Sequence, residues 1–211
     1  MRPVLFVLAG VNGAGKSTLL SRALTQRGLT WFDPDAFARE LVNAGAAQRD
    51  ANGRAWQQGM ALLEAAIAGG HNHAHETTLG GRSMPAKIAE AALTHDVHVW
   101  YCGLDSPERH LERVRARVEA GGHDIDEQRI RERWESAPRN LIALMPVLRE
   151  LRVYDNSQSV RMGEPIPVPC LLLQVRDQAV LRPDAEDLAA LQALPTWSRP
   201  IVEAALARAA G

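Results

Sequence analysis

Apolar and polar positions along the chain follow two alternating periods, which predict strands and helices in turn. Residues 4–9 are an uninterrupted apolar run that ends at Gly10, as is typical of a strand buried on both faces of a parallel sheet. Residues 16–27 follow with helical spacing. The order of strand and then helix recurs, and parallel neighbours need such crossover helices. We therefore expect a three-layer α/β/α sandwich with a mainly parallel sheet.

The remaining elements are predicted by the same criteria, with Asp33 and Ser106 as caps of helices that each begin with a proline. With 211 residues and no internal repeat, we expect a single domain over residues 1–211. Further strands are expected near residues 30–32, 72–76, 97–102, 151–154 and 171–176, and helices from Pro34, near 51–68, 83–95 and 106–120, and from 126, with two short C-terminal helices.

Composition narrows the class of protein. The 24 basic and 25 acidic residues give a net charge of −1, so no overall positive field favours a nucleic-acid partner. The apolar start is too short for a signal peptide, and no segment reaches membrane-spanning length. Cys102 and Cys170 lie in apolar surroundings without metal-binding or redox spacing, and we expect both to be buried. The expectation is a cytoplasmic protein with no membrane partner.

The most specific motif is the run from Gly10 to Ser17, which matches G-x-x-x-x-G-K-[ST] between a predicted strand and a predicted helix. Backbone N–H groups of such a P-loop wrap a phosphate at a helix N-terminus. Lys16 is then expected to contact the β- and γ-phosphates of ATP, and Ser17 to ligate Mg²⁺. A chance glycine-rich turn is the alternative, which the context disfavours. The predicted nucleotide-binding residues are Gly10, Asn12, Gly13, Ala14, Gly15, Lys16, Ser17 and Thr18, with Asn156 from a late turn.

Transfer of a phosphoryl group to a hydroxyl also needs a base, for which Asp35 is the candidate, in the first turn of a helix at the carboxyl end of a strand. Complementing the helix dipole is its alternative role. Glu76 ends a polar strand and is a candidate for holding Mg²⁺ or acceptor hydroxyls, against the alternative of an ordinary solvated carboxylate. The residues expected at the acceptor are Asp35, Glu76, Thr77, Thr78, Arg82 and His123.

Eight arginines gather between residues 109 and 139, on two helices that Gly121 and Gly122 separate. Most are expected to be solvated and paired with neighbouring glutamates. One or two are expected to stabilise the transferred phosphoryl charge from a helical lid at about residues 109–139. Histidines at positions 71, 73 and 75 alternate along one strand, but no further ligand follows, so we expect no metal site there.

Together these residues resemble the zeta toxin family of P-loop kinases, in its short bacterial members, over about residues 4–205. The resemblance implies that Asp35 is the catalytic base, and it places Lys16 and Ser17 in the nucleotide site and Glu76 and Thr78 in the substrate cleft. It implies Arg117 and Arg133 as the arginines that clamp the phosphate, with Arg129 and Arg131 as competitors for the second. The matching stretches are residues 10–19, 33–38, 76–79, 103–108, 117–118, 121–124 and 155–157.

Characterised zeta toxins phosphorylate the 3′-hydroxyl of UDP-N-acetylglucosamine and are neutralised by a small antitoxin. The resemblance therefore implies an ATP- and Mg²⁺-dependent kinase acting on a nucleotide-sugar, with a small antitoxin as partner. The residues also leave open a kinase for another small acceptor, such as a nucleoside or polyol, and a nucleotide-dependent switch ATPase. An interaction protein with an inactive P-loop is disfavoured, because Lys16 and Asp35 are both present.

Overall fold

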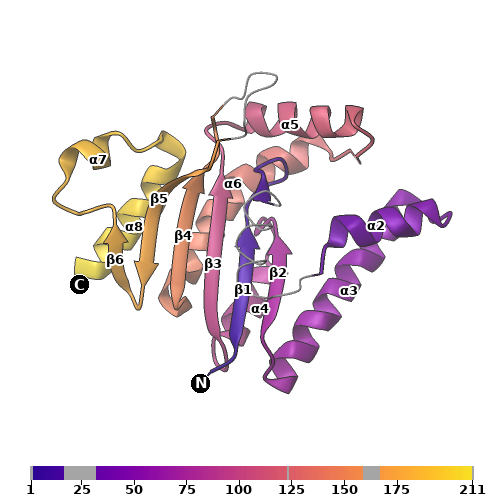
Figure 1. The fold of residues 1–211 in the computed structure, drawn as a ribbon, viewed down its shortest axis with the longest axis horizontal. Coiled ribbons are helices and arrows are strands. Elements are labelled where there is room, and N and C mark those ends of the chain that lie inside the picture. Colours follow the sequence, from indigo (N-terminus) through magenta and orange to yellow (C-terminus); the bar gives the residue numbers. More distant parts are fainter. Residues whose placement is uncertain (1, 17–31, 123, 159–166, 211) are drawn as a thin grey trace.

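A six-stranded sheet organises the computed structural model, which describes residues 2–16, 32–122, 124–158 and 167–210 (Figure 1). The strand order is β2-β1-β3-β4-β5-β6. The first four strands are parallel, and the last two run antiparallel to their neighbours, which confirms the mainly parallel sheet. The strands are β1 (Val4–Ala9), β2 (His73–Thr77), β3 (Asp96–Gly103), β4 (Glu150–Asp155), β5 (Cys170–Arg176) and β6 (Ala179–Arg182).

The helices stand in three places around the sheet (Figure 1). Helices α4, α6 and α8 cover one face, α5 lies above the carboxyl ends of the parallel strands, and α2 and α3 stand beyond the edge formed by β2. Apart from Lys16, the helix expected at 16–27 lies outside the described residues, as do residues 30 and 31 of the strand expected at 30–32. The helices are α2 (Pro34–Asn43), α3 (Gln48–Gly69), α4 (Ser83–Ala91), α5 (Pro107–Glu119), α6 (Glu127–Leu144), α7 (Leu188–Gln192) and α8 (Arg199–Ala210), with short 3-10 turns η1 (Met145–Val147) and η2 (Thr196–Ser198).

Both faces of strand β1 are buried, as its continuous apolar run predicts. Leu5 and Val7 belong to the large cluster shared with α4, α6 and α8. Phe6 and Leu8 point to the opposite face, where Phe6 meets Trp100 edge to face with ring centroids 5.1 Å apart. The chain is therefore an α/β sandwich, as expected from the alternation of strands and helices.

Two predicted helix caps are confirmed. The Oδ1 atom of Asp33 accepts hydrogen bonds from the backbone N–H groups of Asp35 at 2.9 Å and Ala36 at 3.0 Å. Ser106 Oγ accepts from the backbone N–H of Arg109 at 3.3 Å. Because Asp33 satisfies the start of α2, the carboxylate of Asp35 in the same turn is not needed as the cap.

Helix α5 ends in a pattern of backbone hydrogen bonds that requires a glycine. Gly121, at φ +89°, donates its N–H to the carbonyl of Val118 at 2.9 Å, and Gly122 donates to that of Arg117 at 2.8 Å. The left-handed backbone of Gly121 is one that other residues rarely adopt. The two glycines that separate α5 from α6 thus terminate α5.

Three sequence-based expectations differ from the structure. Strand β6 was not predicted, because the turn before it is made by Asp177 and Gln178, at φ 52° and 65°, without the glycine that marks most such turns. The helix expected over 83–95 ends at Ala91. Cys102 is buried as expected, but the expectation for Cys170 was wrong: it is exposed, because it begins β5, whose two ends both lie outside the packed part of the sheet.

The described helices include none that is both long enough and apolar enough to cross a membrane.

Candidate active site

The P-loop follows β1 directly, and its glycines allow a close approach of the neighbouring strand ends. A Cβ atom at Gly10, where φ is +143°, would come within 3.0 Å of the carbonyl oxygen of Cys102 on β3. A Cβ at Gly15, at φ +85°, would collide with the amide nitrogen of Asn156, which follows β4. The loop is therefore seated tightly on the carboxyl ends of two strands. Ser17 and Thr18 lie outside the described residues.

Side chains from outside the loop hold two of its carbonyl groups. Ala14 O accepts hydrogen bonds from Asn156 Nδ2 at 2.9 Å and Cys102 Sγ at 3.1 Å, and Asn12 O is 2.8 Å from His110 Nδ1. Burial raises the pKa of Cys102 to about 12, so the thiol keeps the proton that it donates. Since the C=O and N–H of one peptide point in opposite directions, the N–H groups that follow Asn12 and Ala14 point away from these donors. Loop N–H groups of this kind bind anions.

Lys16 and Glu76 form an ion pair at this edge. The Nζ atom of Lys16 lies 3.4 Å from Glu76 Oε1 and 3.5 Å from the carbonyl of Val11. Strands β1 and β2 are parallel, with Leu8 opposite Glu76, so the P-loop and Glu76 emerge at the same edge. The Lys16 side chain is 7% exposed and that of Glu76 is 19% exposed, which strengthens their mutual attraction relative to water.

Asp35, in the first turn of α2, faces Arg117 of α5. Its Oδ2 atom is 3.6 Å from Nη1 of Arg117, and both side chains are partly exposed. Arg117 belongs to the last turn of α5, where a Cβ at Gly122 would lie 2.7 Å from Arg117 Cγ. Gly122 therefore leaves the space that the Arg117 side chain occupies beside Asp35.

Arg133 reaches the P-loop from α6. Its Nη1 donates to Oδ1 of Asn12 at 2.7 Å. Burial lowers the pKa of Arg133, and the charge of Arg129 acts in the same direction, whereas the charge of Asp35 opposes both. Asp35 is thus close enough to Arg133 to affect it electrostatically. The guanidinium groups of Arg117 and Arg133, the carboxylate of Asp35 and the P-loop therefore meet at one edge of the sheet.

Three arginines, Arg129, Arg131 and Arg133, are candidates for the second position that clamps the phosphate, and their contacts distinguish them. Arg131 is exposed and pairs with Glu108 at 2.7 Å and with Glu127 at 2.8 Å. Arg129 is also exposed. Arg133 alone of the three has a described contact with the P-loop. Solvated ion pairs, as expected for most of this cluster, are also formed by Arg109, Arg115 and Arg139.

The side chains of the other residues expected at the acceptor form no described hydrogen bond or ion pair with the P-loop. The Oγ1 atom of Thr77 accepts from the N–H of Leu79 at 3.0 Å, which is a turn contact. Thr78 is half-buried, and Arg82 is exposed at the N-terminus of α4. His123 lies outside the described residues. The structure therefore brings Asp35 and Glu76 to the P-loop edge, whereas it gives Arg82 no described contact there.

Sequence reasoning did not identify His110 and Arg113, which both support the loop. His110 is 1% exposed, and burial lowers its pKa to about 4, with the nearby charges of Lys16 and Arg113 acting in the same direction. Arg113 Nη2 donates to the carbonyl of Asn156 at 2.6 Å, and burial lowers its pKa. The one available signal was a histidine on the apolar face of α5, next to Leu111.

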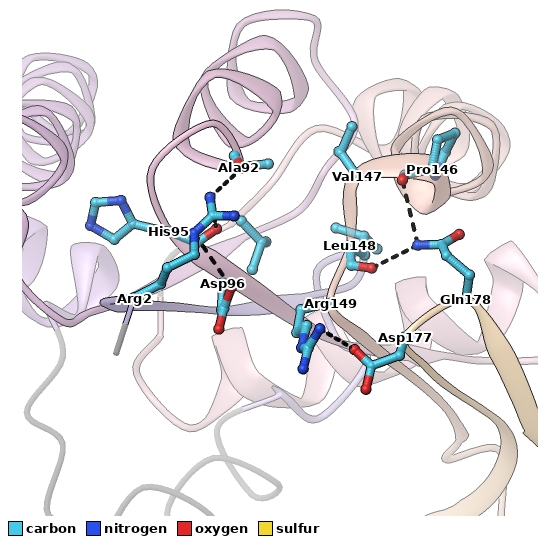
Figure 2. A pocket seen from close by; sticks show the side chains of 11 residues that line it. Arg2, Ala92, His95, Asp96, Pro146, Val147, Leu148, Arg149, Asp177 and Gln178 are labelled. Carbon is cyan, nitrogen blue, oxygen red and sulfur yellow. Dashed lines mark hydrogen bonds and ion pairs between the residues drawn. The ribbon is translucent and has the colours of Figure 1, made fainter.

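A cavity of about 290 Å³ lies at the opposite end of the sheet, beside the N-terminus (Figure 2). Its charged residues are paired: Arg2 Nε lies 3.6 Å from Asp96, and Arg149 pairs with Asp177. Gln178 lines it and donates to the carbonyl of Leu148 at 3.0 Å. These contacts join the N-terminus and the β5–β6 turn to the sheet, and the cavity contains none of the candidate catalytic residues. The chemistry therefore places the candidate active site at the P-loop edge.

Fold and loop together define a P-loop protein with an α/β sandwich. Residues 5–139 match the family model described as an AAA domain, and the chain belongs to this family. An uncharacterized protein of Haemophilus influenzae (strain Rd) is 33% identical over 129 residues, which are 59% of this chain and 88% of that relative.

Several solved structures share the fold at low identity. The AvrRxo1-ORF1:AvrRxo1-ORF2 structure with sulphate ions has a TM-score of 0.63 and 16% identity, over 90% of this chain and 63% of that chain. The same pair with ATP gives 0.60 and 16%, over 83% and 59%. The PezAT chromosomal toxin-antitoxin system of Streptococcus pneumoniae gives 0.55 and 17%, over 73% and 68%. This chain thus spans less than two thirds of the AvrRxo1 chain in each of these two structures, and these identities show a common fold alone.

Proposed function

We propose that this protein is an ATP- and Mg²⁺-dependent small-molecule kinase of the zeta-toxin type, which transfers the γ-phosphoryl group to a hydroxyl. A nucleotide-sugar such as UDP-N-acetylglucosamine is the favoured acceptor. One observation carries the proposal: the carboxylate of Asp35 lies 3.6 Å from Arg117, at the edge where Arg133 contacts the P-loop. A general base beside cationic groups is what transfer to a hydroxyl requires.

The proposed reaction assigns each group a step. The P-loop N–H groups and Lys16 hold the β- and γ-phosphates, and Asp35 accepts the proton of the acceptor hydroxyl as its oxygen attacks the γ-phosphorus. The bond from the γ-phosphorus to the bridging oxygen breaks, and ADP leaves. Arg117 and Arg133 stabilise the charge that spreads over the γ-phosphoryl oxygens.

The observed ion pairs couple nucleotide binding to the base. Phosphate oxygens compete with Asp35 for Arg117 and with Glu76 for Lys16, because both cations lie within 4 Å of these carboxylates. When Arg117 turns to the phosphate, the carboxylate of Asp35 is released from this ion pair and can accept a hydrogen bond from the acceptor hydroxyl.

Few protein ligands are needed for the magnesium ion, which commonly keeps several waters and takes its other ligands from substrate phosphates. Ser17 is one proposed ligand, and Glu76 fits the other position, since its carboxylate lies 3.4 Å from the phosphate-binding lysine. When bound, the ion would neutralise charge on the β- and γ-phosphates.

The proposal includes the lid, the acceptor side and a partner. Arg117 and Arg133 belong to α5 and α6, which form the proposed lid at residues 109–139 of one kinase domain, 1–211, and Arg133 already contacts the P-loop. Thr77, Thr78, Arg82 and His123 are proposed to contact the acceptor. A small antitoxin is the proposed protein partner, in keeping with the fold shared with a toxin-antitoxin system.

An acceptor panel tests the proposal. The purified protein is incubated with ATP, Mg²⁺ and a set of nucleotide-sugars, nucleosides and polyols, and mass spectrometry detects any added phosphate. We expect phosphorylated UDP-N-acetylglucosamine from the wild-type protein and none from Asp35→Asn. A product elsewhere in the panel would replace the acceptor and keep the mechanism, whereas ATP hydrolysis without any phosphorylated product would favour the switch ATPase and contradict the kinase.

A further inference from the structure

His110 is a buried residue that contacts the P-loop through both its side chain and its main chain. Its Nδ1 lies 2.8 Å from the carbonyl oxygen of Asn12. Its own carbonyl oxygen would lie 2.8 Å from a Cβ atom at Gly13, whose φ is +82°, so only a glycine fits there. Helix α5 thus forms the surface on which the first half of the loop rests, and His110 is the residue in contact.

The chemistry of this contact fixes the proton on one ring nitrogen. A carbonyl oxygen can only accept, so the hydrogen bond to Asn12 O requires a proton on Nδ1. Burial keeps the imidazole neutral near pH 7, since its pKa is about 4. The proton is then absent from Nε2, which is buried without a hydrogen-bond partner among the described residues.

An unpartnered buried nitrogen is unfavourable, and an apolar residue such as leucine would fill similar space without it. The hydrogen bond from Nδ1 is the described interaction of the ring that an apolar residue could not make. It acts on the same residue that Arg133 holds, since Arg133 Nη1 donates to the side-chain Oδ1 of Asn12 at 2.7 Å. Asn12 is therefore held by its main chain from α5 and by its side chain from α6.

We propose that His110 is a positioning residue that holds the Asn12 carbonyl through its Nδ1–H and so presets the P-loop for the phosphates of the nucleotide. The inference rests on the proposed function only in taking a nucleotide as the ligand. Preorganised loop N–H groups bind a phosphate without a further ordering penalty, so loss of the contact should weaken binding of the nucleotide rather than abolish folding.

The choice of replacement separates this role from simple packing. The amide N–H of asparagine can occupy the place of Nδ1, whereas that of glutamine reaches the place of Nε2, and leucine supplies neither. The affinity of each variant for Mg²⁺ and a non-hydrolysable ATP analogue is measured by calorimetry, together with its thermal midpoint. We expect His110→Asn to bind within about threefold of the wild type, and His110→Gln and His110→Leu to bind roughly tenfold more weakly, as for one lost hydrogen bond.

Equal affinities for the asparagine and glutamine variants, with folding intact, would overturn the assignment. If both variants fail to fold, the wild-type protein decides: two-dimensional ¹⁵N NMR of the imidazole should show a protonated Nδ1 and an unprotonated Nε2 between about pH 6 and 8. A protonated Nε2 would overturn the inference. Failure of the wild-type protein to bind the analogue would instead overturn the proposed function together with this inference, so the two failures are distinguishable.

Discussion

Replacing Gly80 by alanine should displace the Arg133 side chain from the P-loop without removing any charged group from the protein. A methyl group at this position would lie 3.0 Å from Arg133 Cβ and closer still to Cγ. Ordinary contacts between carbon atoms are about 3.5–4 Å, so the two groups must separate by roughly 0.5–1 Å. The atoms involved are next to the backbone of α6, which means that a change of side-chain rotamer cannot relieve the overlap.

The surrounding loop cannot easily move away instead. Ser136 Oγ donates to the carbonyl of Gly80 at 2.9 Å, and Asn140 Nδ2 donates to that of Leu79 at 2.7 Å. Displacement therefore falls on the Arg133 side chain and its 2.7 Å contact with Asn12. Since a misplacement of about 1 Å can reduce the rate of an enzyme roughly 100-fold, we expect kcat of Gly80→Ala to fall by about that factor. Overpacking should also lower stability by about 1–3 kcal/mol.

Gly81→Ala provides a matched control, because a Cβ there would meet no atom within 4 Å and neither glycine has a left-handed φ. The assay compares phosphoryl transfer at saturating ATP with the thermal midpoint of both variants. Gly81→Ala should retain kcat within about twofold of the wild type. A folded Gly80→Ala variant with the kcat of Gly81→Ala would refute the role given to Arg133.

Three further outcomes are expected. Arg133→Ala should lower kcat by roughly 10²–10³ with little change in ATP affinity. Arg131→Ala, which removes two solvated ion pairs, should leave both kcat and ATP affinity unchanged in steady-state kinetics. Asp33→Ala should lower the free energy of unfolding by about 1 kcal/mol, with Asp33→Asn retaining most of it in urea melts; equal losses would contradict the cap. Burial lowers the pKa of His75 to about 4, so below the unfolded value of 6.5 the unfolded chain binds a proton that the folded one excludes. Stability should therefore fall as the pH drops from about 6.5 to 4, and His75→Leu should show a shallower fall in thermal midpoint.

The parts of the fold that could be predicted are those encoded by local patterns. The β1 run, the P-loop and the Asp33 cap each occupy a few consecutive residues, so spacing alone locates them. The turn at Asp177 could not be predicted, since its left-handed backbone is formed without glycine. The exposure of Cys170 could not be predicted either, because apolar neighbours in the sequence do not show where a strand leaves the packed sheet.

The candidate site also contains residues that the sequence could predict and residues that it could not. Asp35 and Glu76 could be proposed from their positions at strand ends, because parallel strands bring such ends to one edge. The contacts of His110 and Arg133 with Asn12 could not, since they join residues 98 and 121 positions apart in the chain. They depend on how α5 and α6 pack over the loop, and helical periodicity identifies the face that packs without identifying its partner.

Transfer of label from γ-labelled ATP tests the proposed kinase activity most directly. The wild-type protein and Asp35→Asn are each incubated with Mg²⁺, labelled ATP and UDP-N-acetylglucosamine, and the products are separated into inorganic phosphate and phosphorylated sugar nucleotide. We expect the label on the sugar nucleotide with the wild-type protein, and unreacted ATP with Asp35→Asn, which should still bind the nucleotide. Label released only as inorganic phosphate, at equal rates for both proteins, would contradict both the transfer reaction and the assignment of Asp35 as its base.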